Sequence, residues 1–175
     1  MDVAELTRLQ NAGARLKFLF FWGHRTPGPG YLSQWWPSPF TVDGISYATA
    51  EHFMMAGKAR LFGDEETAAA VIAAPHPRLA KDLGRRVRNF DEQTWRDNRV
   101  AIVTRGGEAK FGQNEDLRDY LLGTGDRVLV EASPLDRVWG IGLAADDPRA
   151  EQASTWRGQN LLGFALMTAR AALAS

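Results

Sequence analysis

Past its middle the chain reads Leu129-Val130-Glu131-Ala132-Ser133-Pro134-Leu135-Asp136-Arg137-Val138-Trp139-Gly140-Ile141-Gly142. The first part is apolar and predicts a strand over residues 127–131, and the rest is a loop with a carboxylate, a tryptophan and two glycines. Loops at the end of a rigid strand are where proteins place binding and catalytic side chains. We therefore expect an active site at this loop, with Trp139 positioned to contact a flat ring.

The rest of the chain has the pattern of short helices with a few short strands. Apolar residues at helical spacing, polar caps and terminal glycines mark the segments. We expect helices over residues 2–15, 50–61, 65–73, 78–83, 91–103, 108–111, 115–122 and 160–173, and strands over residues 18–22, 40–47 and 127–131. Asp43-Gly44 predicts a tight hairpin within residues 40–47. Gly106-Gly107 predicts a break in the longest helix.

Length and composition indicate the architecture. A chain of 175 residues can build one hydrophobic core but is short for two. We expect an α+β fold: a single helix-rich domain with a small antiparallel or mixed sheet. Residues 1–17 are expected to form an N-terminal helical extension, and residues 18–175 the catalytic domain. The loop over residues 23–39 holds four of the eight prolines but also several aromatic side chains, which favours ordered packing.

The composition also excludes several classes of protein. No apolar run is long enough to span a bilayer and no secretory signal is evident, so a cytoplasmic protein without membrane contact is expected. There is no cysteine, and the three histidines, His24, His52 and His76, are scattered, so we expect neither a metal nor a cofactor. The formal net charge of zero argues against broad capture of a nucleic-acid backbone.

Glu51 stands in the first turn of the helix expected over residues 50–61. A carboxylate there is favoured by the helix dipole alone, which is the simpler interpretation. However, Glu51, Met55 and Lys58 fall on one helix face, and such a face can line a cleft. Gly57 lies in the middle of the helix, where a closely packed backbone or a ligand would explain it. His52 faces elsewhere and is expected to be a packing residue.

The remaining candidates also have two interpretations each. Asp136 can stabilise a turn through its own side chain or act as an acid or base. Trp139 and Trp95 can be core residues or can stack on a ring. Lys110 and Arg85 suit a phosphate but can equally be solvated surface charges.

Taken in order, the motifs of the chain resemble those of the NADAR family. The residues that carry the resemblance are Ser33-Gln34-Trp35, Val42-Asp43-Gly44, Glu51-His52-Phe53, Lys58, Lys81, Gly84-Arg85, Phe90-Asp91, Trp95, Arg99, Lys110-Phe111, Leu129-Val130-Glu131, Asp136, Trp139-Gly140-Ile141-Gly142 and Trp156-Arg157-Gly158-Gln159-Asn160-Leu161-Leu162-Gly163. Gln34 and the Met55-Ala56-Gly57 stretch depart from the usual pattern of that family.

The resemblance implies an N-glycosidase, a hydrolase that cleaves a ribosyl C–N bond without a cofactor. It implies a phosphorylated, nucleotide-like small molecule as substrate: phosphoribosylamino-pyrimidine intermediates of riboflavin biosynthesis, cleaved to release ribose 5-phosphate. The positions implied as catalytic are Glu51, Asp136 and Trp95. Those expected to bind substrate are Lys58, Trp139, Arg85, Lys110, Asn160 and Gly140.

Two alternatives remain open at this point. The same chemistry could remove ADP-ribose from a modified guanine in a nucleic acid or nucleotide. The domain could also bind NAD or ADP-ribose without cleaving it, although a purely binding protein need not retain both carboxylates.

Overall fold

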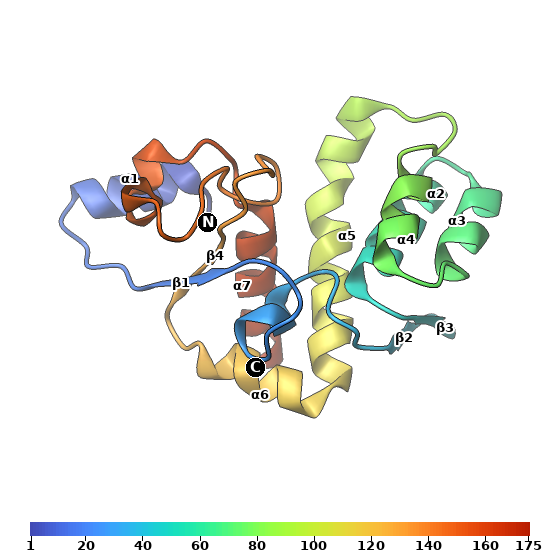
Figure 1. Cartoon of the computed structure of the whole chain (residues 1–175), viewed down its shortest axis with the longest axis horizontal. Helices are drawn as coiled ribbons and strands as arrows, with labels where there is room; N and C mark the ends of the chain where they lie inside the picture. The colour runs from blue at the N-terminus through green and yellow to red at the C-terminus, as the bar shows by residue number, and fades with distance from the viewer. The chain divides into compact units, whose positions relative to one another are not determined.

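The computed structural model describes residues 1–175. The chain divides into two compact units, one formed by residues 1–33 with 119–175 and the other by residues 34–118. Helices predominate over strands, which confirms the helix-rich α+β class (Figure 1). None of these helices is both long and apolar enough to cross a membrane. The prediction of an extension at residues 1–17 and one domain at 18–175 stays a prediction.

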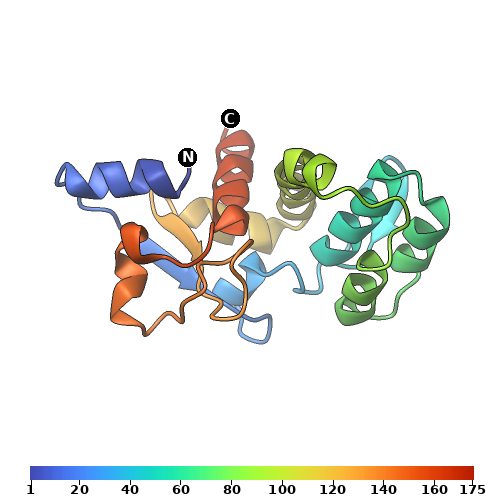
Figure 2. The same ribbon diagram turned by 90° about the horizontal axis from the view of Figure 1, so that it is seen from above.

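The first unit is built around a pair of parallel strands. β1 (Phe18–Phe21) pairs with β4 (Val128–Glu131), in a register that places Phe18 opposite Val128 and Phe21 opposite Glu131. The helix α7 (Leu161–Leu173) packs on β4, as the view in Figure 2 shows. The apolar core of the unit includes Val128 and Val130 of β4 and Phe164 of α7.

The N-terminal helix α1 (Val3–Asn11) is anchored to the same unit. Leu6 is fully buried in its core. The Gln10 side chain donates to the Glu151 carbonyl at 2.8 Å and accepts from the Ala153 amide at 2.9 Å. These two bonds hold α1 against the short 3-10 helices η2 (Pro148–Glu151) and η3 (Ala153–Thr155). A third 3-10 helix, η1 (Pro29–Leu32), lies in the long loop after β1.

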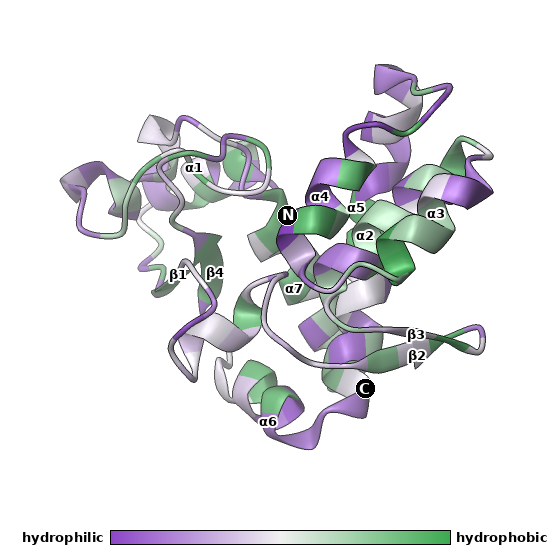
Figure 3. Ribbon diagram, turned by 45° about the vertical axis from the view of Figure 1, so that its right-hand side comes forward, coloured by the Kyte–Doolittle hydropathy of each residue, from purple (hydrophilic) through white to green (hydrophobic).

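The second unit is a cluster of helices with one hairpin. Its elements are β2 (Phe40–Val42), β3 (Ile45–Tyr47), α2 (Ala50–Leu61), α3 (Glu65–Ile72), α4 (Pro77–Gly84) and α5 (Glu92–Gln113). The helix α6 (Glu115–Gly123) spans the boundary between the units. α2 is the central helix of the unit, since α3, α4 and α5 all pack on it, and its ribbon mixes hydrophobic and hydrophilic residues in Figure 3.

The turn and cap chemistry follows the sequence. The β2–β3 hairpin turns at Asp43 and Gly44, which have φ angles of 52° and 77°, as a two-residue hairpin turn requires. The side chains of Thr49, Asp64 and Asp91 cap α2, α3 and α5, each accepting a hydrogen bond from a first-turn amide. The predicted boundaries of α2 and α3 are therefore correct within one residue.

The predicted break at Gly106-Gly107 is wrong, because α5 continues through both residues. A Cβ atom on Gly106 would lie 2.7 Å from Cδ1 of Phe53 on α2. Similarly, a Cβ atom on Gly57 of α2 would lie 2.9 Å from Cγ2 of Ile102 on α5. These glycines let two helices approach closely, so helix packing explains Gly57 without a ligand. The helix predicted over residues 2–15 also ends earlier, at Asn11.

Candidate active site

Glu51 occupies the first turn of α2 in the second unit, as expected. Only 3% of the residue is exposed, and its backbone amide donates to the Gln34 carbonyl at 3.0 Å. Glu51 stands in the first turn of α2, where the positive end of the helix dipole favours an acidic residue. A buried anion at a helix N-terminus can stabilise a positive charge that develops on a substrate.

His52, the next residue, has a structural role. Its Nδ1 lies 2.8 Å from the Thr49 hydroxyl and its Nε2 lies 3.0 Å from the Ala74 carbonyl oxygen. Burial lowers the pKa of His52. The neutral ring ties the start of α2 to the segment after α3, as expected of a packing histidine.

Lys58 and Trp95 lie together in the second unit. The Lys58 ammonium is 5.6 Å from the Trp95 ring centroid and 4.4 Å from that of Phe90, and it donates to the Gly84 carbonyl at 2.9 Å. Burial lowers the pKa of Lys58, and Glu92 partly offsets this effect. Trp95 is 8% exposed, so its ring is mostly packed. The cluster fixes a cation on the same helix face as Glu51, two turns further along α2.

The two other predicted cations differ in their surroundings. Arg85 is well exposed and forms an ion pair with Asp82, with its NH1 nitrogen 3.1 Å from the carboxylate. Lys110 is only 1% exposed, its ammonium lies 4.9 Å from the Phe111 ring centroid, and burial lowers its pKa to about 7. Substrate contact by either residue stays a prediction.

Asp136 organises the loop that follows β4 in the first unit. Its Oδ1 accepts hydrogen bonds from the amides of Val138 and Trp139, both at 2.8 Å. The side chain therefore closes a turn, the simpler of its two expected roles. Since Oδ1 accepts both bonds, Oδ2 is the atom through which Asp136 would act chemically. Trp139, whose amide donates one of these two bonds, is half-buried.

Gly140 and Asn160 tie this loop to β4 and α7. A Cβ atom on Gly140 would lie 2.8 Å from the Glu131 carbonyl oxygen, so only glycine fits. Asn160 is fully buried, with its Oδ1 accepting from the Glu131 amide at 3.0 Å and its Nδ2 donating to the Leu129 carbonyl at 2.9 Å. Both bonds go to the backbone of β4, so Asn160 positions the strand end. A contact between Asn160 and substrate stays a prediction.

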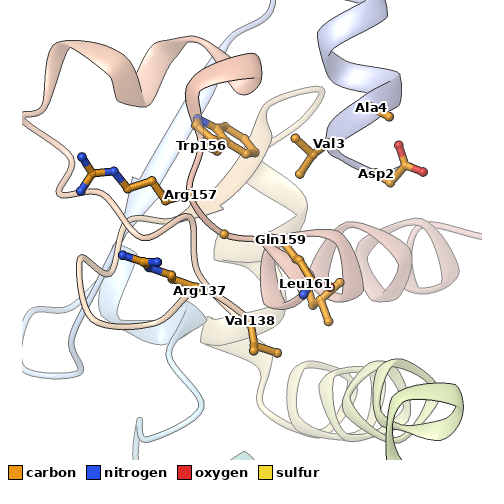
Figure 4. A pocket seen from close by; sticks show the side chains of 10 residues that line it. Asp2, Val3, Ala4, Arg137, Val138, Trp156, Arg157, Gln159 and Leu161 are labelled. Atoms are coloured by element: carbon orange, nitrogen blue, oxygen red, sulfur yellow. The ribbon is translucent and has the colours of Figure 1, made fainter. Parts of the chain in front are cut away.

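Arg137 and Arg157 were not among the predicted site residues. Both line a cavity of about 590 Å³ in the first unit (Figure 4). The signal in the sequence was their position, since Arg137 directly follows Asp136 and Arg157 directly follows Trp156.

The predicted residues thus fall into two groups. In the second unit, α2 carries Glu51 and Lys58, and the neighbouring helix α5 carries Trp95, whose ring centroid lies 5.6 Å from the Lys58 ammonium. Asp136 and Trp139 are brought together in the other, where Gly140 and Asn160 hold their loop against β4. No group of three or more His, Asp or Glu side chains is arranged to hold a metal ion.

Comparisons with known proteins identify similar chains. The model of the NADAR domain matches residues 20–174. The chain is 42% identical over 161 residues to "N-glycosidase R617" of Acanthamoeba polyphaga mimivirus, which covers 88% of this chain and 95% of that protein. It is 32% identical over 141 residues to "Riboflavin biosynthesis protein VVA0006" of Vibrio vulnificus, covering 81% of this chain but only 35% of that larger protein.

A third relative has a solved structure. The chain is 31% identical over 136 residues to "N-glycosidase YbiA" of Escherichia coli, covering 78% of this chain and 76% of that protein. The NMR structure of E. coli YbiA superposes with a TM-score of 0.73 at 28% identity, covering 90% of this chain and 85% of that one.

Proposed function

The chain belongs to the NADAR domain family, and we propose that it is an N-glycosidase that hydrolyses the ribosyl C–N bond of phosphoribosylamino-pyrimidine intermediates of riboflavin biosynthesis. The observation that carries this proposal is the family match over residues 20–174, together with relatives named N-glycosidase. The relative named as a riboflavin biosynthesis protein supports the choice of substrate.

The carboxylates of the two groups suit this reaction. When the C–N bond breaks, its electron pair leaves with nitrogen and positive charge develops on the anomeric carbon and ring oxygen. We assign Glu51, a buried carboxylate at a helix N-terminus, to stabilise that charge. Water then adds to the anomeric carbon and gives up a proton, while the departing nitrogen accepts one.

Asp136 is assigned to this proton transfer through Oδ2. Its Oδ1 is already held by two backbone amides, so the carboxylate is fixed in orientation before substrate binds. Exchange of roles between Glu51 and Asp136 is the alternative assignment. Trp95 and Trp139 are assigned to the flat heterocycle, and Lys58 to the phosphate or the leaving group.

A paired hydrolysis assay tests the function. The purified protein is given a phosphoribosylamino-pyrimidine in one reaction and ADP-ribosylated guanine DNA in the other. Release of ribose 5-phosphate alone supports the proposal, and release of ADP-ribose alone would replace it with removal of a base modification. Ligand binding without product in either reaction would overturn it in favour of a binding module.

The variants Glu51→Gln and Asp136→Asn test the assigned residues. Each is expected to lower kcat by about 10²–10⁴-fold, the contribution typical of a positioned acid or base. The matched control is Glu65→Gln, which changes an exposed first-turn glutamate on α3 and should keep full activity. A folded Glu51→Gln protein with full activity would refute the assignment.

A further inference from the structure

A cavity of about 590 Å³ lies in the first unit beside the turn that Asp136 closes (Figure 4). This volume is in the range of small-molecule sites. One wall is the beginning of α1, with Val3, and the others come from the loops around Val138 and Trp156. The residues of α1 precede position 20, where the family match begins, so this chain adds a wall to the cavity from outside the matched region.

Arg137 and Arg157 lie next to one another on this cavity and extend in the same direction (Figure 4). Their spacing depends on Gly142, whose φ is 68°. A Cβ atom there would lie 3.0 Å from Cβ of Arg157 and 3.1 Å from Cγ of Arg137. Glycine therefore leaves free the space into which both arginine stems pack.

The backbones that carry the two arginines are joined by hydrogen bonds. The Gln159 amide donates to the Arg137 carbonyl at 3.0 Å, and the Arg157 amide donates to the Ile141 carbonyl at 2.9 Å. The bases of the two side chains are thus held in place before any ligand arrives, which reduces the entropy lost on binding.

The two guanidinium groups are exposed and form no ion pair with a carboxylate within the protein. Asp147, whose pKa is lowered mainly by Arg149 and to a smaller extent by Arg157, forms its ion pair with Arg149, at 2.7 Å. Asp2, the one acidic residue on the cavity, lies on the side away from the guanidinium groups (Figure 4). Two neighbouring like charges repel, so an anion bound between them would be stabilised by both.

We propose that Arg137 and Arg157 form a subsite for the phosphoryl group of a nucleotide-like ligand, on the side of the cavity away from α1 (Figure 4). The identity of that ligand as the substrate rests on the proposed function. The subsite adjoins Asp136, because Val138 lines the cavity and donates its amide to the Asp136 carboxylate. The arginine pair thereby binds the phosphate end while the turn of Asp136 faces the ribosyl bond.

Direct binding tests the subsite without any need for catalysis. Inorganic phosphate and pyrophosphate are titrated at low salt into the full chain and into the variants Arg137→Gln and Arg157→Gln. Each variant is expected to bind about tenfold or more weakly, the loss typical of one charge-assisted interaction. Arg149→Gln is the matched control, since this exposed arginine already has a carboxylate partner, and it should bind like the unmodified protein. Equal binding by the double variant Arg137→Gln/Arg157→Gln would overturn the subsite.

Enzyme kinetics then test whether the subsite binds the phosphoryl group of the substrate or only free phosphate. In the double variant KM for the phosphorylated substrate should rise at least tenfold, kcat should change less than threefold, and KM for the dephosphorylated substrate should be unchanged. Lost pyrophosphate binding with an unchanged KM for phosphorylated substrate would overturn the assignment to substrate. If the unmodified protein hydrolyses neither substrate, the proposed function fails, and the titrations still decide the subsite.

Discussion

Replacing Asn160 by alanine is expected to destabilise the first unit by about 3–8 kcal/mol. The change removes the side-chain amide of Asn160, which is fully buried. The Glu131 amide and the Leu129 carbonyl of β4 then lose the hydrogen bonds that they make with it. An orphaned buried group costs about 1–3 kcal/mol, giving about 2–6 kcal/mol for the two. Asn160 also has a φ of 53°, and alanine in this left-handed region adds about 1–2 kcal/mol.

Two further variants separate these contributions. Asn160→Gly removes the same hydrogen bonds but accepts the positive φ, so it should be about 1 kcal/mol more stable than Asn160→Ala. Asn98→Ala is the matched control, because the amide of Asn98 makes one bond to the Thr94 carbonyl within α5 and is partly exposed. Its loss should stay below about 1.5 kcal/mol.

Urea unfolding followed by tryptophan fluorescence measures these differences, provided that the slope with denaturant is the same in all variants. A typical domain is stable by about 5–15 kcal/mol, so Asn160→Ala should move the midpoint far toward zero denaturant. A loss below about 1 kcal/mol would refute the positioning role. If that small loss came with a large rise in KM, Asn160 would instead be the substrate contact expected from the family resemblance.

Two other changes test the packing and the electrostatics. Gly106→Ala should destabilise the second unit by up to about 2 kcal/mol, because overpacking against Phe53 at about 1–3 kcal/mol exceeds the gain of about 1 kcal/mol in helix propensity. Gly123→Ala, with open space around it, should be neutral or stabilising in the same unfolding assay. Hydrogen bonds from Arg88 hold the pKa of the Asp64 carboxyl well below its usual range, so its contribution to stability is present above about pH 4 and is lost as the pH falls. The difference in unfolding midpoint between the unmodified protein and Asp64→Asn should therefore shrink below pH 4, and a constant difference down to pH 2 would contradict this.

The pH expectation follows from the direction of the shift. Asp64 binds a proton more weakly in the folded chain than in the unfolded one, so acid favours unfolding. Arg88, in turn, has its pKa raised by the same pair and stays charged throughout. The carboxylate therefore accounts for the expected pH dependence.

Sequence alone determined the features that depend on neighbouring residues. The caps at Thr49 and Asp64 and the hairpin at Asp43-Gly44 were predictable, because a side chain that bonds a nearby amide, or a turn that needs positive φ, depends on few residues. The ordered motifs also indicated the family, and with it Glu51 and Asp136 as candidate carboxylates.

Only the tertiary structure decided the features that depend on distant segments. Gly106 predicted a helix break because helix propensity is judged from the residue itself. The structure shows instead that glycine is needed there because the Phe53 ring of α2 packs against this position of α5. The sequence did not show that the Asn160 amide bonds to the backbone of a strand about thirty residues earlier in the chain. The pairing of Arg137 with Arg157 across Gly142 likewise arises from a fold that joins two loops, because contacts between residues far apart in sequence are set by packing and not by local preference.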